Sequence, residues 1–208
     1  MAKNQELVDA IINGDRKTSA KLVQDSVDDG VEVVELLNES MIPAMKEIGE
    51  KFARNEVYVP EMLIAARAMQ AGLNIIEPIL SAKGHQPVGK VCIGTVKGDL
   101  HDIGKNLVVM MLKGAGWEVN DLGVDCDINK FQAAVDEGAQ AVCCSALLTT
   151  TMDYMRAISE HFSNTETKMF IGGAPITQDF ADEIRADGYA ENANDAVRLI
   201  SEVLGTNA

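Results

Sequence analysis

The stretch Val91-Cys-Ile-Gly-Thr-Val-Lys-Gly-Asp-Leu-His-Asp-Ile-Gly104 decides the fold class of this chain. Its first six residues form a short apolar run with β-forming side chains, and a helical pattern follows from Ile103 to Leu112. A strand that leads through a polar loop into a helix is the first part of a β–α–β unit. We therefore predict an α/β sheet whose first strand begins near Val91.

The same alternation of strand and helix continues to the end of the chain. Strands are expected at Val91–Val96, Glu118–Leu122, Ala139–Cys144, Lys168–Ile171 and Gly188–Ala190. Helices are expected at Ile103–Leu112, Ile128–Val135, Met152–Phe162, Phe180–Ile184 and Ala193–Leu204. Regular alternation predicts a doubly wound, parallel, five-stranded sheet of the Rossmann or flavodoxin-like kind.

The first eighty or so residues have a helical pattern and few glycines. Helices are expected at Leu7–Ile12, Lys17–Asp28, Val31–Phe52 with a bend around Pro43, and Pro60–Leu80. Pro78 is expected to kink or end the last turn of the fourth helix. Four helices with short links predict an antiparallel four-helix bundle. The expected domains are a helical cap at 1–83, a linker at 84–89 and an α/β domain at 90–208.

Composition limits the function classes. The 208 residues are 47% hydrophobic, and acidic residues outnumber basic ones 32 to 18, for a net charge of −14. That charge would repel nucleic acid and an anionic membrane surface, so small molecules or proteins are the expected partners. We see no signal peptide and no apolar run long enough to span a bilayer. The four cysteines are interpreted as reduced, mostly buried thiols, which favours a cytoplasmic location.

Ligands of such sheets bind beyond the carboxyl ends of the strands. Three loops leave that edge: Lys97–Gly104 after the first strand, Ser145–Thr151 after the third and Gly172–Pro175 after the fourth. In a flavodoxin-like order these three strands are neighbours. We expect their loops to form one continuous cleft.

His101 is the residue of greatest chemical interest in these loops. A neutral imidazole binds transition metals well, and its other ring N–H is usually donated to a carboxylate or hydroxyl. Asp99 and Thr151 are candidates for that hydrogen-bonded chain. From His101 alone, a second interpretation stays open, in which Asp99 or Asp102 caps the next helix and His101 is a solvated loop residue.

The glycines of these loops also allow two interpretations. Gly104, Gly172 and Gly173 either serve helix packing and a turn, or they clear space for a bulky group between the loops and the sheet. The spacing does not match a P-loop, and GxGxxG is absent after the first strand. A nucleotide-binding enzyme is therefore poorly supported.

Together these residues resemble a known family. Asp99-Leu-His-Asp-Ile-Gly104 is a full instance of the DxHxxG motif of cobalamin-binding domains, and Ser145-Ala-Leu147 and Gly172-Gly173 are similar to their SxL and GG elements. Phe52–Leu80 resembles the helical cap of methionine synthase and of corrinoid methyltransferase proteins. The two parts cover nearly the whole chain, as in the small corrinoid proteins of anaerobic methyltransferase systems.

The resemblance implies a corrinoid cofactor, either cobalamin or a related cobamide, whose cobalt carries a methyl group. It assigns His101 as the lower axial ligand, with Asp99 and Thr151 tuning it. Methionine synthase has serine where this chain has Thr151, so the hydroxyl is kept but its side chain has a stiffer rotamer. The implied cofactor-binding residues are His101, Asp102, Ile103, Gly104, Ser145, Leu147, Thr149, Gly172 and Gly173, with Phe52 and Val59 covering the methyl-bearing face.

The implied function is that of a methyl carrier, the corrinoid component of a methyltransferase system that is not active alone. A donor-specific methyltransferase would place the methyl group on cob(I)amide, and a second would pass it to tetrahydrofolate or a thiol such as coenzyme M. A reductive activase would restore oxidised cofactor. Methanol, methylamines, glycine betaine and aryl methyl ethers stay open as donors. A corrinoid-dependent sensor or regulatory module is the alternative, and a radical-mutase subunit is a further rival expected to lack this cap.

Overall fold

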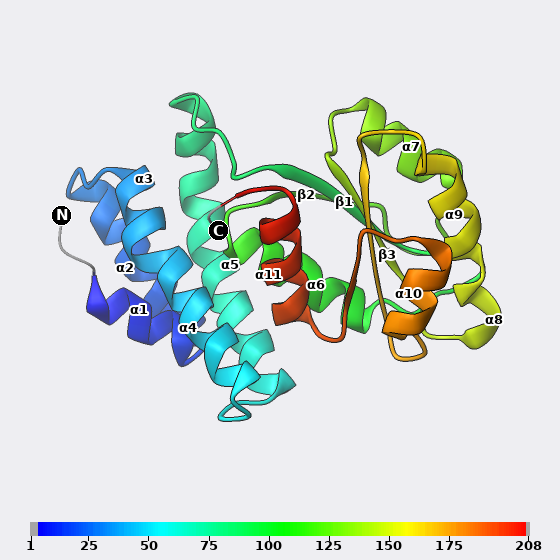
Figure 1. The fold of residues 1–208 in the computed structure, drawn as a ribbon. Helices are drawn as coiled ribbons and strands as arrows, with labels where there is room; N and C mark the ends of the chain where they lie inside the picture. The colour runs from blue at the N-terminus through cyan, green and yellow to red at the C-terminus, as the bar shows by residue number, and fades with distance from the viewer. Residues whose placement is uncertain (1–3, 207–208) are drawn as a thin grey trace. The chain divides into compact units, whose positions relative to one another are not determined.

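The structure is a computed structural model that describes residues 4–206. It divides into two compact units, one helical and one built around a sheet (Figure 1). The helical unit extends to Pro87 and also takes in Lys113–Gly116, and the α/β unit holds Val88–Leu112 and continues from Trp117. The sequence-based boundaries at 84 and 90 stay a prediction.

The helical unit contains the four expected helical segments. Its elements are α1 (Gln5–Ile12), α2 (Arg16–Asp28), α3 (Val33–Leu36), the π-helical turn η1 (Leu37–Met41), α4 (Ile42–Ala53) and α5 (Val59–Ala82). Asn4 and Asp15 start α1 and α2, because each side chain accepts a hydrogen bond from an N–H of the first turn. The core contains Val23 of α2 and Met69 and Ile76 of α5, all fully or nearly fully buried.

Two prolines act differently from the simplest expectation. The helix is not interrupted before Pro43. It continues from α3 to α4 through a π-helical turn, in which Ile42 N–H donates to Leu37 C=O, five residues back. A wider turn suits a proline, which has no N–H to donate and crowds the carbonyl four residues before it. Pro78 does not end α5, which runs four residues further to Ala82.

The α/β unit has the predicted alternation. Its strands are β1 (Lys90–Thr95), β2 (Glu118–Asp121), β3 (Ala141–Ser145), β4 (Lys168–Gly172) and β5 (Gly188–Ala190). Its helices are α6 (Ile103–Gly114), α7 (Ile128–Asp136), α8 (Thr149–Met152), α9 (Tyr154–Phe162), α10 (Gln178–Ile184) and α11 (Ala193–Val203). All paired strands are parallel, in the order β2-β1-β3-β4-β5, so the flavodoxin-like prediction is confirmed.

Helices cover both faces of this sheet. Figure 1 shows α7, α9 and α10 on one face, with α6 and α11 on the other. Phe131 of α7, Ile158 of α9 and Phe180 of α10 pack in one core cluster. Val142 of β3 and Ile171 of β4 belong to the same cluster. All four cysteines are buried free thiols. Within residues 4–206 no helix has the length and apolarity needed to cross a bilayer.

Candidate functional site

The strand register brings the three predicted loops to one edge of the sheet. Thr95 pairs with Ser145, and Ser145 pairs with Gly172, so the last residues of β1, β3 and β4 stand in a row. Val96 N–H donates to Ser145 C=O at 3.0 Å, and Ala146 N–H donates to Gly172 C=O at 3.2 Å, so the pairing continues into the loops. Loops far apart in the sequence therefore start side by side.

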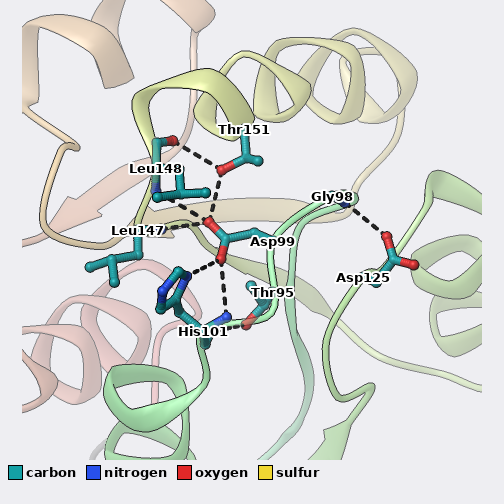
Figure 2. Close-up of polar contacts among 8 residues, drawn as sticks. All are labelled: Thr95, Gly98, Asp99, His101, Asp125, Leu147, Leu148 and Thr151. Carbon is teal, nitrogen blue, oxygen red and sulfur yellow. Dashed lines mark hydrogen bonds and ion pairs between the residues drawn. The ribbon is translucent and has the colours of Figure 1, made fainter.

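The Asp99 carboxylate lies at the centre of this edge and is fully buried. Oδ1 accepts the His101 main-chain N–H at 3.0 Å and lies 2.7 Å from His101 Nδ1. Oδ2 accepts the N–H groups of Leu147 and Leu148 at 2.8 and 3.2 Å and the Thr151 hydroxyl at 2.8 Å (Figure 2). One carboxylate thus joins the loop after β1 to the loop after β3.

These contacts determine the charge of Asp99. Burial acts to raise the pKa of this carboxyl, because it disfavours the charged form. The hydrogen bonds from the two loops act in the other direction and outweigh burial, so the pKa lies well below its ordinary value of 3.8. Asp99 is therefore an anion at neutral pH, despite its lack of solvent.

The charge of Asp99 in turn fixes the tautomer of His101. An ionised carboxylate only accepts hydrogen bonds, so the proton shared at 2.7 Å belongs to Nδ1 of the ring. In the neutral ring, Nε2 then keeps its lone pair. The His101 side chain is 52% exposed, so this nitrogen belongs to a ring that a ligand can approach. Such an arrangement, a carboxylate behind a histidine, is typical of histidines that bind metals.

Three contacts of this loop were not predicted from the sequence. The Thr95 hydroxyl donates to His101 C=O at 2.8 Å, the Leu148 N–H joins that of Leu147 on Asp99, and Asp125 accepts a hydrogen bond from Gly98 N–H at 2.8 Å. Each of the three involves a main-chain group, which every residue type carries, so no motif marks it. Thr95 could have been inferred from its place at the end of the first strand.

Apolar side chains around His101 are unusually exposed for their type. Leu100 is 71% exposed and Ile103 78%, on either side of His101 in the chain. Leu147 and Leu148, whose N–H groups bind Asp99, are 44% and 41% exposed. Figure 2 shows the Leu147 side chain beside the His101 ring. Exposed apolar residues gathered around a polar centre mark a ligand or interaction site.

The remaining predicted residues of the α/β unit lie near the same edge. Gly172 and half-buried Ser145 end their strands, and Thr149 is exposed at the start of α8. Asp102 is exposed, directly precedes α6, and its carboxylate accepts a hydrogen bond from Asn106 Nδ2. The Asp99 carboxylate instead binds groups of the two loops.

Phe52 and Val59 lie in the other compact unit. Phe52 is half-buried near the end of α4, and Val59 is 41% exposed at the start of α5. The turn at 54–58 connects the two helices. Their place over a cofactor stays a prediction.

Comparison with known proteins identifies the family of this chain. A family model described as a B12 binding domain matches residues 89–198, and a second model with the same description matches residues 4–77. A corrinoid protein of Desulfitobacterium hafniense (strain Y51) is 39% identical over 213 residues, covering 99% of both chains. A trimethylamine corrinoid protein of Methanosarcina barkeri is 40% identical over 215 residues, covering 98% of this chain and 99% of the relative.

Two solved structures match nearly the whole of this chain. The methanol:cobalamin methyltransferase complex of Methanosarcina barkeri contains a chain that matches with a TM-score of 0.86 and 25% identity, over 96% of this chain and 78% of that one. A cobalamin-binding protein of Desulfitobacterium hafniense DCB-2 matches with a TM-score of 0.78 and 26% identity, over 97% and 98% of the chains. This chain therefore belongs to the family of B12-binding corrinoid proteins.

Proposed function

We propose that the protein carries a methyl group on a corrinoid cofactor, whose cobalt His101 Nε2 would hold. The observation that supports this most directly is the 2.7 Å contact between His101 Nδ1 and the buried, ionised Asp99 carboxylate. It holds the ring in one orientation and leaves Nε2 as the nitrogen with a lone pair. Imidazole nitrogen is a suitable donor for cobalt.

The surroundings of His101 fit a corrinoid. The macrocycle is broad and largely apolar, and the exposed side chains of Leu100, Ile103, Leu147 and Leu148 offer it an apolar seat. A Cβ built on Gly104 would meet nothing within 4 Å, so there is open space where the nucleotide tail is expected to enter. We assign tail contacts to Ser145, Thr149, Gly172 and Gly173, which lie at the same edge.

When bound, the corrinoid supplies a cobalt that takes a methyl group from a donor and gives it to an acceptor. The protein's residues bind and orient the group and hold the proton on Nδ1. His101 Nε2 would hold the cobalt, and Asp99 keeps the ring in one orientation. The Thr151 hydroxyl fixes Asp99 Oδ2, and also lies 2.9 Å from Leu148 C=O. Phe52 and Val59 are proposed to exclude water from the methyl-bearing face.

The donor is proposed to be a methylamine. Relatives that are 40% and 38% identical to this chain are named trimethylamine and dimethylamine corrinoid proteins. The match to a chain of a methyltransferase complex supports a donor methyltransferase as a direct partner. A second methyltransferase for the acceptor and a reductive activase complete the proposed system, which we place in the cytoplasm.

Ligation is tested by His101→Ala in the cofactor-loaded protein. The parent should bind about one corrinoid per chain, with the cofactor's own base displaced from cobalt and a histidine in its place. His101→Ala should shift the visible spectrum to that of water-ligated cobalt. His161→Ala is the matched control, since that exposed ring contacts Gln132 at 2.7 Å and lies outside the three loops. An unchanged spectrum in His101→Ala would reject the assignment.

Carrier function is tested by mixing the reduced, loaded protein with a methylamine methyltransferase and its substrate. One methyl group per corrinoid should be taken up, and turnover should become catalytic only after the acceptor methyltransferase is added. If the protein instead holds adenosylcobalamin, releases it in light and accepts no methyl group with any partner, the sensor function replaces the carrier function.

A further inference from the structure

The loop that follows β2 runs against the loop that carries His101. Val96 and Cys126 form an isolated parallel bridge, and Cys126 N–H donates to Thr95 C=O at 2.9 Å. One residue earlier, Asp125 N–H donates to Asp99 C=O at 3.1 Å. Its side chain bonds the same loop, because Gly98 N–H donates to Asp125 Oδ1 at 2.8 Å (Figure 2). Asp125 thus holds two consecutive residues, Gly98 and Asp99, by their main chains.

Asp125 makes these two contacts from an unfavourable backbone conformation. Its φ of +51° lies in the left-handed region, which residues other than glycine rarely adopt. Among those residues, asparagine and aspartate tolerate it best. Gly98, its partner, has a φ of +84°. Both loops thus adopt the left-handed conformation at the residues that the hydrogen bond joins. The conformation of each loop therefore depends on the other.

We propose that Asp125 is a positioning residue for His101. By fixing Gly98 and the main chain of Asp99, it sets where the Asp99 carboxylate meets His101 Nδ1, and so how firmly Nε2 is presented to cobalt. Among the hydrogen bonds of the described residues, Asp125 has none to His101 itself, so it acts through Asp99. This inference rests on the proposed ligation by His101, and it adds a residue that no motif of the family resemblance contains.

Three substitutions separate the parts of this role. Asp125→Asn keeps the Oδ1 acceptor and the tolerance for a left-handed backbone, and removes only the charge. Asp125→Gly keeps the backbone conformation and removes the acceptor. Asp125→Ala removes both. Arg185→Gly is the control for backbone strain, because Arg185 is also left-handed, with a φ of +59°, and lies between α10 and β5, at the opposite edge of the sheet.

The first measurement uses the cofactor-free protein. Hydrogen exchange at the Gly98 amide should become about tenfold faster in Asp125→Gly and Asp125→Ala, as expected for loss of a hydrogen bond to a charged group. The ¹⁵N signals of the His101 ring should shift in the same two variants. Asp125→Asn and Arg185→Gly should resemble the parent in both signals. If Gly98 exchange or the His101 signals stay unchanged in Asp125→Gly, the positioning role is wrong.

The second measurement uses the loaded protein and its visible spectrum. The ratio of histidine-bound to histidine-free cobalt should fall about tenfold in Asp125→Gly and remain near the parent value in Asp125→Asn. A fall in melting temperature without a spectral change would show a merely structural role and overturn the proposal. If His101→Ala leaves the spectrum unchanged while Asp125→Gly still moves the ring signals of the cofactor-free protein, the ligation has failed and the positioning of His101 has not.

Discussion

At the scale of single residues, the glycines of the site have different reasons for being glycine. Gly173 has a φ of +131°, and a Cβ there would overlap the main-chain carbonyl of Ala146, so the fold itself requires glycine. Gly104 has an ordinary backbone in α6 and open space around it. The chain's own packing therefore requires glycine at Gly173, whereas nothing in the described chain demands glycine at Gly104.

This difference predicts opposite effects of two alanine substitutions. Gly104→Ala should leave the cofactor-free protein as stable as the parent or more stable by up to about 1 kcal/mol, since alanine favours a helix. It should nevertheless weaken corrinoid binding, because the alanine side chain would enter the space proposed for the nucleotide tail of the cofactor. Gly173→Ala should destabilise the cofactor-free protein by several kcal/mol, roughly the cost of strain with a backbone clash. Urea unfolding and corrinoid titration measure both, and unaltered binding in Gly104→Ala would contradict the tail assignment.

The Asp99 carboxyl predicts how the cofactor-free protein responds to acid. Its folded pKa lies below the unfolded value of about 3.9, so above that pH both states are ionised and its stabilising contribution is fully present. As the pH falls below about 4, the unfolded chain takes up the proton first and the contribution is lost. Asp99→Asn should be less stable at neutral pH and should lose less stability between pH 5 and 2. Parallel acid curves for parent and variant would argue against the depressed pKa.

At the scale of elements, the hydrophobic pattern was sufficient to predict every strand, and most helices begin and end within two residues of the expected bounds. Short apolar runs with polar loops between them mark the elements locally. Pro60 was predicted in the first turn of α5 because its missing N–H is not needed there. The π-helical turn at Leu37–Met41 was not predicted, because it depends on how one carbonyl avoids Pro43. The expected helix Met152–Phe162 is two helices, α8 and α9, that meet at Asp153.

The site was predicted less completely than the fold. His101, Asp99 and Thr151 carry side chains whose chemistry can be recognised in a sequence. Thr95 and Asp125 both act on main-chain groups. The Thr95 contact lies within the loop after β1, whereas the Asp125 contact exists because β2 lies beside β1. A one-residue shift in the register of β2 would leave the sequence motifs intact and remove the Asp125 contact.

The four buried cysteines are expected to be unreactive in the folded protein. Burial raises the pKa of Cys92 to about 12 and raises those of Cys143 and Cys144 as well, and the pKa of Cys126 rises for the same reason. A thiol reagent needs the thiolate, so the folded protein should react very slowly at pH 8. All four thiols should be titrated at once after unfolding in urea. Rapid reaction of one thiol in the folded protein would show that its strand is more open than the structure indicates.

At the scale of the whole molecule, the chain joins two units that each have a core of their own. The connection between α5 and β1 is mostly exposed, and Gly84 there has a φ of +68°, at a position where a Cβ would meet nothing within 4 Å. Such a segment has little to hold it in one conformation. It coincides with the linker predicted at 84–89 and is the place where we expect a hinge.

Limited digestion with trypsin should therefore cut first after Lys83. A protease needs several residues of locally opened chain, and the exposed segment that begins at Lys83 supplies them, whereas most other lysines and arginines lie in helices and strands. The fragments should correspond to residues 1–83 and 84–208. Lys83→Gln is the matched control. It removes the cut and also an exposed ion pair with Glu32 at 2.9 Å, whose loss costs at most about 1 kcal/mol, so the fold should persist.

The exposed loop around Lys97 offers a second site whose behaviour depends on the cofactor. Lys97 stands two residues before Asp99, so a corrinoid bound at His101 should slow cleavage there, while cleavage after Lys83 should continue because the linker is outside the site. Mass spectrometry of the first fragments, with and without corrinoid, separates the two cuts. A first cut inside residues 5–82 would contradict the predicted boundary between the units. Equal cleavage after Lys97 in both states would contradict a cofactor seated on the His101 loop.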